Sequence, residues 1–515
     1  MNEKMAATIK QASFRIEHFH LENGGAAASI SPSLFVMQPD YDSRCDSFRK
    51  PDDTCRDSIY WPEQIFLPPF PALEAKKFPM FFRALVTLFV LLLFSPDAMA
   101  ENWPQWRGPN ANSVVPAGDY PTSWNAEEGV AWKVALPGKG SSTPAIWEDN
   151  LFLTYNVGTA ANTLACLDRQ GKEKWKVELG TAIPGKYGIA SGANPSPITD
   201  GSYVYVFFKS GNLACLDFDG TIVWHQNVQQ LFGKDTSDTI WWDLGTSPVL
   251  TRGSIVLAYQ RSAAKKDGDE KPPAYSDNSF VVSFDRKSGD VEWKQDRNLK
   301  APRESAQSYT TPLVIGHGKS RIQAIVVLGA DHVTAHDESD GKELWRFGTL
   351  NPNHEEYWRS IASATFNKDY IFAPYARGGS LTAIKHGSSG DVTGSRLHWV
   401  IENVSSDCAT PIASGGKVYS GTDRGMLTSI DIATGEIDWQ IELEKSGKRY
   451  KSSPILAGDR IYWAREDGAI FVVQVGTEPK IVSKNEMGES MVATPILVDG
   501  QLFLRTLDHL YCIGK

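Results

Sequence analysis

The 515-residue sequence lacks the residue patterns that mark several large classes of protein. Its net charge of -9 is spread along the chain without a basic stripe, which argues against binding of nucleic acid. It has no Gly-rich phosphate loop, no Gly-x-Ser-x-Gly elbow and no regularly spaced group of metal ligands. No motif for phosphate transfer, serine hydrolysis or zinc chemistry is therefore present.

The one marked apolar run is too short to cross a bilayer comfortably. Residues 84–94 form an uncharged run of about eleven residues, whereas a spanning helix needs about 20. Lys76, Lys77 and Arg83 place positive charge before the run, and an Ala-x-Ala triplet at 98–100 follows it. These are the parts of a secretory signal, so we predict a periplasmic or secreted protein without a membrane span after cleavage.

A signal peptide normally stands at the N-terminus, yet residues 1–79 precede this one. They show no sustained period of 2 or 3.6 and mix polar runs with Pro-rich pieces. The simplest interpretation is that translation starts at Met80 and that residues 1–79 are a disordered or misassigned upstream extension. A genuine long leader or an uncleaved anchor is the alternative. Residues 80–100 are then the signal peptide.

The chain is rich in one repeated pattern, a hairpin that combines Asp, Gly and Trp. An alternating apolar strand ends at an Asp, whose side chain can accept hydrogen bonds from the N–H groups of the turn. A Gly then supplies the positive φ of the turn, and the returning strand carries a Trp that buries a large ring. The clear copies are 164–175, 213–224, 281–293, 333–345 and 427–439, and degenerate copies lie at 381–399, 470–475 and 510–514.

A second signature precedes each hairpin: a small polar residue before Pro, followed by an apolar strand. Its copies are 142–144, 195–197, 246–248, 310–312, 409–411, 452–454 and 493–495, with 361–364 as a copy without Pro. The copies are separated by roughly 40 to 65 residues, which is the period of a four-stranded propeller blade. We therefore predict an all-β fold, a single eight-bladed β-propeller of four-stranded antiparallel blades over residues 129–515.

The two ends of the repeat region complete each other. Trp132 lies on a returning strand that no hairpin precedes, whereas the last hairpin strand, ending at Gly514, has no Trp strand after it. We predict that the N-terminal strand joins the last blade and closes the ring. Closure removes two sheet edges that would otherwise template aggregation.

The Asp-x-x-x-Gly-x-x-x-Trp core, as in 431–439, resembles the repeat of the pyrroloquinoline-quinone (PQQ) propeller family. That family includes quinoprotein alcohol dehydrogenases and the propeller lipoprotein of the outer-membrane β-barrel assembly machinery. The resemblance implies the fold over nearly all of the chain after the signal, but it does not decide the activity, because the family contains enzymes and non-enzymes. Glu101 rather than Cys follows the expected cleavage site, which departs from the lipoprotein member.

The resemblance also implies that residues 101–128 form an N-terminal arm lying across the propeller. Arg107 stands among aromatic residues in this arm, and its expected role is to clasp the arm onto the propeller by packing. Stacking of Arg107 on a ligand is the alternative.

Cysteine is scarce, and its positions follow the repeat. Of the 6 cysteines, Cys166, Cys215 and Cys512 occupy one repeat position, where another copy holds Ser283. In a closed ring the same strand of different blades lies beyond the roughly 7 Å between Cα atoms that a disulfide can bridge. Although an exported protein is free to form disulfides, we predict small buried thiols; Cys408 is unassigned.

Three insertions enlarge the loops between blades. Residues 261–278 are charged and are expected to be a solvated excursion, whereas 228–245 and 351–359 are rich in aromatic and charged residues. Loops that precede the inner strand of each blade gather at one mouth of a propeller's channel, so we predict a binding funnel there. Its candidate residues are Tyr187, Trp241, Trp242, Arg303, Tyr309, Tyr357, Trp358 and Arg359.

An enzyme hypothesis begins at Trp242-Asp243, which resembles a Trp-Asp pair of the quinoprotein dehydrogenases, in which the Asp is the catalytic base. Those enzymes stack PQQ on a disulfide between adjacent cysteines and require Ca²⁺ held by oxygen ligands. This sequence has no adjacent cysteines and no Cys-x-x-Cys-His haem segment, and no calcium ligands can be placed by motif. We therefore predict no catalytic residue, cofactor or metal, and keep a PQQ- and calcium-dependent dehydrogenase of alcohols or sugars, with Asp243 as base, as the alternative.

The binding hypothesis requires fewer special residues. The aromatic and Arg side chains of the funnel are the types that contribute most to interfaces. We therefore predict an exported scaffold or recognition module for a protein, peptide or polysaccharide of the cell envelope. The resemblance to the barrel-assembly lipoprotein implies a relation to outer-membrane protein assembly.

Overall fold

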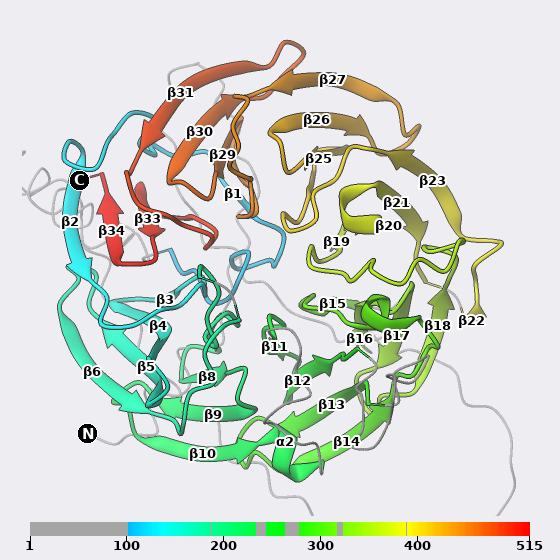
Figure 1. The fold of residues 1–515 in the computed structure, drawn as a ribbon, viewed down its shortest axis with the longest axis horizontal. Coiled ribbons are helices and arrows are strands. Elements are labelled where there is room, and N and C mark those ends of the chain that lie inside the picture. The colour runs from blue at the N-terminus through cyan, green and yellow to red at the C-terminus, as the bar shows by residue number, and fades with distance from the viewer. Residues whose placement is uncertain are drawn as a thin grey trace, which may run out of the picture. The chain divides into compact units, whose positions relative to one another are not determined.

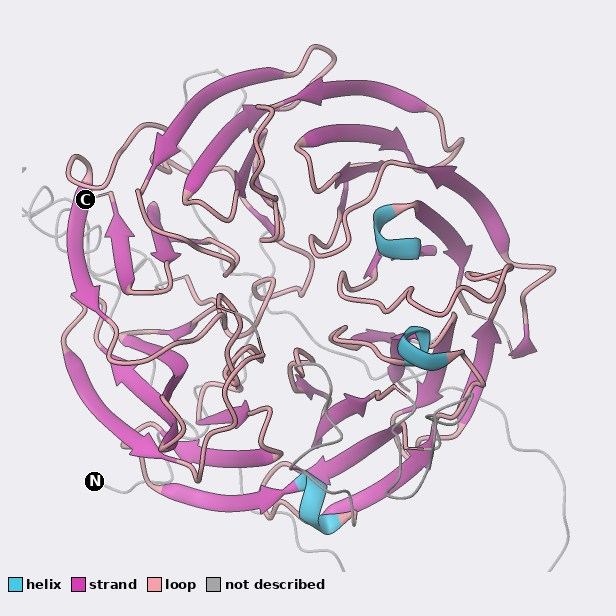
Figure 2. Ribbon diagram, in the orientation of Figure 1, coloured by secondary structure: helices cyan, strands magenta, loops and turns pink. Residues whose placement is uncertain are grey.

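The computed structural model of the chain describes residues 101–186, 188–232, 244–262, 278–316, 323–387 and 389–514. Within these residues the strands form eight sheets that stand around a ring (Figure 1, Figure 2). Each sheet is a blade of four antiparallel strands, and two sheets carry a fifth short strand that pairs in parallel. The fold is thus the eight-bladed β-propeller that the repeat predicts.

The first four blades follow the chain from the inner strand outward. Blade 1 contains β3 (Ala145–Trp147), β4 (Asn150–Val157), β5 (Ala161–Leu167) and β6 (Glu173–Glu178). Blade 2 contains β7 (Ile198–Thr199), β8 (Tyr203–Phe207), β9 (Asn212–Asp217) and β10 (Ile222–Asn227). Blade 3 contains β11 (Val249–Leu250), β12 (Ser254–Tyr259), β13 (Phe280–Asp285) and β14 (Val291–Asp296). Blade 4 contains β15 (Leu313–Gly316), β16 (Gln323–Gly329), β17 (His332–Asp337) and β18 (Glu343–Phe347).

The other four blades have the same order, and the last one takes its outer strand from the start of the propeller. Blade 5 contains β19 (Thr365–Phe366), β20 (Tyr370–Tyr375), β21 (Ser380–Lys385) and β23 (Leu397–Glu402). Blade 6 contains β24 (Ile412–Ser414), β25 (Lys417–Gly421), β26 (Met426–Asp431) and β27 (Ile437–Glu442). Blade 7 contains β28 (Ile455–Ala457), β29 (Arg460–Ala464), β30 (Ala469–Gln474) and β31 (Lys480–Glu486). Blade 8 contains β32 (Ile496–Val498), β33 (Gln501–Arg505), β34 (His509–Ile513) and β2 (Val130–Ala135).

The remaining elements are short. The extra strands are β1 (Val114–Val115) on blade 7 and β22 (Gly390–Asp391) on blade 4. The helical turns are α2 (Val228–Leu231), η2 (Arg303–Ala306) and η3 (Ala376–Gly378). Among the described residues, no helix combines the length and the apolar character needed to cross a membrane.

The blades share their hydrophobic cores with their neighbours. Every residue of β5 and of β12 is buried, whereas the outer strand β2 alternates between half-buried and exposed residues. One apolar cluster joins Tyr205 and Trp224 of blade 2 to Leu257 of blade 3. The middle strands are covered on both faces, so they are apolar throughout, while the outer strands keep the alternation of a half-exposed sheet.

The hairpin turns use Asp and Gly as the sequence predicts. In blade 1 the Oδ1 atom of Asp168 accepts hydrogen bonds from the N–H groups of Gln170 (3.0 Å) and Lys172 (2.8 Å), and Gly171 has φ +81°. In blade 6 Asp431 accepts from the N–H of Ala433 in the same way. The Asp closes the turn by capping its donors, and the Gly supplies the left-handed residue.

Each repeat Trp joins its blade to the next one. At six blade junctions the indole N–H donates to a backbone carbonyl oxygen in the hairpin turn of the following blade. These bonds run from Trp132 to Arg169, Trp175 to Phe218, Trp224 to Arg286, Trp293 to Glu338, Trp399 to Ile432 and Trp439 to Gly476, at 2.7–3.0 Å. Trp345 is fully buried without such a bond among the described residues, because the hairpin of blade 5 is extended by the insertion that carries β22.

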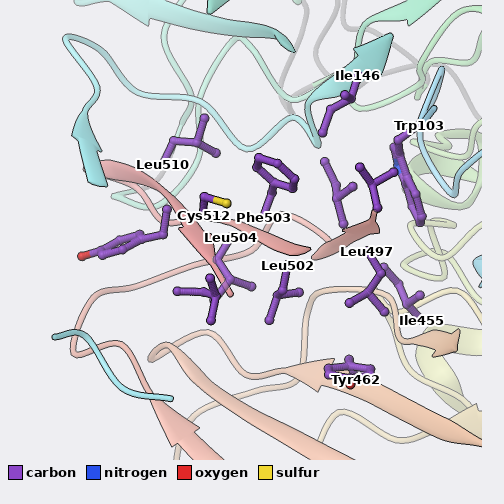
Figure 3. Close-up of a cluster of buried hydrophobic side chains, with 14 of the residues drawn as sticks. Trp103, Ile146, Ile455, Tyr462, Leu497, Leu502, Phe503, Leu504, Leu510 and Cys512 are labelled. Carbon is purple, nitrogen blue, oxygen red and sulfur yellow. The ribbon is translucent and has the colours of Figure 1, made fainter. Parts of the chain in front are cut away.

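The ring is closed by the first and last long strands. β2 pairs antiparallel with β34, so that Trp132 lies opposite Cys512 and Val134 opposite Leu510. Cys512 lies in the apolar cluster of this seam together with Phe503 (Figure 3). The prediction that the N-terminal strand completes the last blade is confirmed.

The repeat-position cysteines are structural. Cys166, Cys215 and Cys512 are buried and free, as predicted from their small-residue position. Burial raises the pKa of each of these thiols to about 12, so they stay protonated at neutral pH.

Candidate functional site

The second sequence signature forms a closed ring of hydrogen bonds around the channel. One Ser or Thr precedes the inner strand of each blade, and its backbone N–H donates to the side-chain oxygen of the corresponding residue in the next blade. The donor–acceptor pairs are Thr143–Ser196, Ser196–Ser247, Ser247–Thr311, Thr311–Ser363, Ser363–Thr410, Thr410–Ser453, Ser453–Thr494 and Thr494–Thr143, at 2.9–3.3 Å. We call these eight residues the hydroxyl ring. It explains why the signature requires a hydroxyl.

A following Pro helps to hold each ring residue in place. A residue before Pro is restricted to extended conformations, and Pro offers no competing N–H. Ser363, which Ala364 follows instead, still makes both ring bonds. The hydroxyl is therefore the essential part of the signature, and the Pro supports it.

The hydroxyl ring surrounds a central cavity of about 220 Å³. Trp106, Tyr309, Cys408 and Lys451 also line this cavity. Of the described residues that line the cavity, Lys451 is the only charged one, and its Nζ atom lies 2.6 Å from a carboxylate oxygen of Glu466. The cavity wall is therefore polar, with mainly neutral hydroxyl groups.

The N-terminal arm closes one end of the channel. Trp103 forms backbone hydrogen bonds with Ile146 of blade 1, and Arg107 donates through Nη2 to the carbonyl oxygen of Pro411 beside blade 6 (2.6 Å). β1 then pairs with β28 of blade 7. Arg107 is buried and bonded within the protein, so it packs the arm against the blades and is not available to stack on a ligand.

The opposite end, where the loops between successive blades meet, is the loop mouth. Of the predicted funnel residues, Tyr309 lines the central cavity, and Arg303 and Tyr357 form a pair. Nη1 of Arg303 lies 3.1 Å from the Tyr357 hydroxyl and 2.9 Å from a carboxylate oxygen of Glu356. The Tyr357 side chain is 54% exposed, which makes it accessible to a partner.

Two further predicted residues have structural contacts. Trp358 is half-buried and packs against the apolar cluster shared by blades 4 and 5. Arg359 lies 2.7 Å from Glu304 and 3.6 Å from Asp407 in ion pairs that are largely shielded from solvent. Tyr187, Trp241, Trp242 and Asp243 lie outside the described residues.

Arg359 belongs to a belt of ion pairs on the loops of blades 4 to 7, which we call the charged belt. Its pairs are Arg303–Glu356, Arg359–Glu304, Arg359–Asp407, Arg377–Asp407, Arg449–Asp423 and Lys451–Glu466. Burial raises the pKa of Asp407, although Arg359 and Arg377 oppose the shift. Burial disfavours the charge on Arg359, but Asp407 and Glu304 outweigh it, so the pKa of Arg359 is raised.

Most members of the charged belt carry no sequence signal. Glu304, Asp407, Asp423 and Glu466 come from four separate loops, and none belongs to the Asp-Gly-Trp hairpin or to the Pro-containing signature. Their shared position follows from the ring closure, which brings loops distant in sequence to one face. Predicting these ion pairs from the sequence would have required knowing how the strands pair within each blade and where each loop then lies on the ring.

The described residues do not fit a calcium–quinone centre. No group of three His, Cys, Asp or Glu side chains in this part of the chain is placed to hold a metal ion. Cys166, Cys215, Cys408 and Cys512 are free, so the described residues do not supply the disulfide ring on which the quinone would stack. The central cavity instead offers hydroxyl groups and one ion-paired lysine.

The fold resembles several solved propellers. The crystal structure of BamB from Moraxella catarrhalis superposes with a TM-score of 0.51 at 15% identity, covering 75% of this chain and 97% of that one. The quinohemoprotein alcohol dehydrogenase from Comamonas testosteroni superposes with a TM-score of 0.57 at 13% identity, covering 82% of each chain. At these identities the likeness shows the fold alone.

Sequence comparison identifies the family. A curated relative, the outer membrane protein assembly factor BamB of Salmonella typhimurium (strain LT2), is 26% identical over 102 residues, which are 20% of this chain and 25% of the relative. The alignment thus spans about a quarter of that relative's length. The sequence pattern of one family matches four overlapping segments, 113–264, 160–346, 274–396 and 391–515. With most of its residues matched, the chain belongs to the PQQ-repeat propeller family described as "Outer membrane protein assembly factor BamB".

Proposed function

We propose that the protein is a non-enzymatic scaffold of the cell envelope that binds another protein at its loop mouth. The observation that carries the proposal is the exposed Tyr357 beside Arg303 at the edge of the charged belt. Tyr and Arg are enriched at the centres of protein interfaces. A rigid ring that holds such side chains on fixed loops favours recognition of a folded partner.

The partner that we propose is a protein of the outer-membrane assembly process. The family description and the curated relative both name outer membrane protein assembly, which supports this choice. The expected signal at residues 80–100 supports delivery to the same compartment. Because Glu101 rather than Cys follows the expected cleavage site, we propose a periplasmic or secreted product without a lipid anchor.

The binding proposal is tested with purified assembly proteins from the same organism in a surface plasmon resonance assay. We expect Tyr357→Ala and Arg303→Ala each to weaken binding about tenfold, the usual effect of truncating a central contact. Val291→Ala changes a side chain that is 41% exposed on the outer strand β14, and it serves as the control. Binding that neither loop-mouth substitution weakens would overturn the proposed site.

The export proposal has a separate test. The natural gene is expressed in its host, the cells are fractionated, and the N-terminus of the recovered protein is sequenced. We expect a periplasmic or extracellular product that begins near Glu101. A cytoplasmic product that retains residues 80–100 would contradict the signal-peptide prediction.

A further inference from the structure

At the junction between blades 6 and 7, the repeat Trp lacks a cover that five other junctions share. At five junctions the turn Gly of the following blade lies under the indole ring. A Cβ atom added to Gly171, Gly220, Gly289, Gly341 or Gly435 would come within 2.3–2.8 Å of Trp132, Trp175, Trp224, Trp293 or Trp399, respectively. A Cβ atom added to Gly476, in the turn that follows Trp439, would meet nothing within 4 Å.

The sequence of blade 7 explains this difference. Its hairpin, one of the degenerate copies, has Gln474 where other copies have Asp, and its turn runs through Gly476 to Pro479. Nε1 of Trp439 still donates to the Gly476 carbonyl oxygen (2.7 Å), but no turn glycine lies against the indole ring. A groove of about 510 Å³ opens beside Trp439.

Two aromatic rings and four polar side chains line this groove, which we call the Trp439 groove. The rings of Trp439 and Tyr419 lie 6.0 Å apart at an angle of 37°. The polar lining residues are Lys417, Ser429, Asp438 and Thr477. A volume of this size is within the range of small-molecule sites.

The polar side chains are held in a fixed arrangement. Nζ of Lys417 lies 2.9 Å from a carboxylate oxygen of Asp431 and 2.8 Å from one of Asp438, and the Ser429 hydroxyl donates to Asp438 (3.0 Å). These hydrogen bonds raise the pKa of Lys417 to about 12. The cluster therefore presents both donors and acceptors, and its two carboxylates and one ammonium leave a net negative charge.

We propose that the Trp439 groove binds a neutral hexopyranose unit of a saccharide. A pyranose ring has a flat C–H face that suits an indole platform, and a belt of hydroxyl groups that pair with carboxylate, ammonium and hydroxyl side chains. The net negative charge disfavours uronic acids. The groove lies away from the loop mouth, so this inference does not depend on the proposed protein partner.

A partner's Phe side chain fits the groove less well than a sugar. A benzene ring would cover Lys417 and Asp438 without replacing the hydrogen bonds that water makes to them, and burying such groups without new partners is costly. A sugar covers the same area and restores those bonds through its hydroxyl groups. The mixed lining of the groove therefore favours a carbohydrate.

The test uses isothermal titration calorimetry with three defined tetrasaccharides: cellotetraose, chitotetraose and, as the acidic counterpart, tetragalacturonate. For a site that contacts one hexose unit, we expect a dissociation constant on the order of 1 mM. The test variant is Gly476→Phe, which fills the groove, and the matched control is Gly394→Phe. Both glycines are exposed, lack a positive φ and have open space around an added Cβ, so both variants should fold.

We expect the wild type and Gly394→Phe to bind at least one neutral tetrasaccharide equally well. Gly476→Phe should bind it at least about tenfold more weakly, with an unchanged thermal unfolding midpoint. Three results would each overturn the proposal: no binding of either neutral tetrasaccharide, equal binding of tetragalacturonate, or binding that Gly476→Phe leaves intact. Binding of N-acetyl-phenylalanine amide in the groove without any sugar binding would assign it to a peptide partner instead.

Discussion

Trp132, on the first long strand of the propeller, lies opposite Cys512 on the last strand, so the two ends of the propeller chain share blade 8. The Trp132 indole also donates to the Arg169 carbonyl oxygen of blade 1 (2.8 Å). Trp132 therefore connects the last strand of the chain, within blade 8, to the neighbouring blade 1. Closure of this kind leaves no open junction between blades at which the ring could begin to unfold.

The first prediction compares two repeat Trp residues that differ in burial and in whether a turn glycine packs against the indole ring. Trp399 is 9% exposed and lies against Gly435, whereas Trp439 is half-buried with no turn glycine against its ring. Trp399→Ala should lower the free energy of unfolding by about 3–5 kcal/mol, and Trp439→Ala by no more than about half of that. Urea unfolding curves of the two variants measure the difference. Equal losses would show that the turn glycine adds nothing to the junction.

The second prediction concerns the hydroxyl ring. Ser363→Ala removes the acceptor of the Thr311 N–H, which lies 3.0 Å from the Ser363 hydroxyl. A buried donor without an acceptor costs about 1–3 kcal/mol, and we expect a loss of this size in urea unfolding. Ser363→Thr is the matched control, because Thr311 and Thr410 already occupy ring positions and a Thr keeps the hydroxyl. If both variants lose the same stability, the hydroxyl does not hold the ring together.

The sequence predicts the fold well because the fold is built from a repeated unit. The spacing of Asp168 and Gly171, repeated in other blades, encodes a turn that local hydrogen bonds and one positive φ determine. The strand of Trp132 was assigned to the last blade because each end lacked what the other supplied. The turn signals are local and the missing partner strands show up by comparing repeats, so both can be detected without knowing how distant segments pack.

The site is less predictable because it depends on contacts between loops. Arg303 and Tyr357 were predicted from their residue types alone, and the structure pairs them. Asp407 and Glu304 were missed, since only the folded ring brings them to Arg359. Trp358 was predicted as a binding residue from its type, and the structure adds that it is half-buried against an apolar cluster, a contact that residue type alone does not reveal.

The third prediction concerns the arm that closes the channel. Arg107 donates to Ser113 Oγ (2.9 Å), to the Asn112 carbonyl oxygen (3.1 Å) and to the Pro411 carbonyl oxygen. A Lys cannot reproduce this planar set of donors, so Arg107→Lys should cost about 2–3 kcal/mol of stability. Amides at 103–113 should then exchange faster with deuterium.

Arg252→Lys, at an exposed position, is the control for the arm experiment. It should change neither the urea midpoint nor the exchange rate of the arm. Slow exchange at 103–113 in Arg107→Lys, equal to that of the wild type, would contradict a clasping role for Arg107.

The fourth prediction is a dependence of stability on pH through His336. The Thr334 hydroxyl oxygen accepts from the Arg297 Nε–H (2.8 Å) and lies 2.9 Å from Nε2 of His336, to which it donates when the ring is neutral with its proton on Nδ1. Nδ1 of His336 donates to the Gly341 carbonyl oxygen (3.0 Å). The neutral ring satisfies both of its nitrogens here, and a positive charge on it would be buried beside the Arg297 guanidinium.

Burial, assisted by the positive charge of Arg297, lowers the pKa of His336 from 6.5 to about 4. The unfolded chain therefore binds a proton more readily than the folded one as the pH falls. The stability that neutral His336 contributes is complete above pH 6.5 and is lost progressively between pH 6.5 and 4, a loss on the order of 3 kcal/mol. Urea unfolding across this range should show a shallower slope against pH for His336→Gln, which does not titrate. Parallel pH profiles of the wild type and the variant would exclude His336 as the cause.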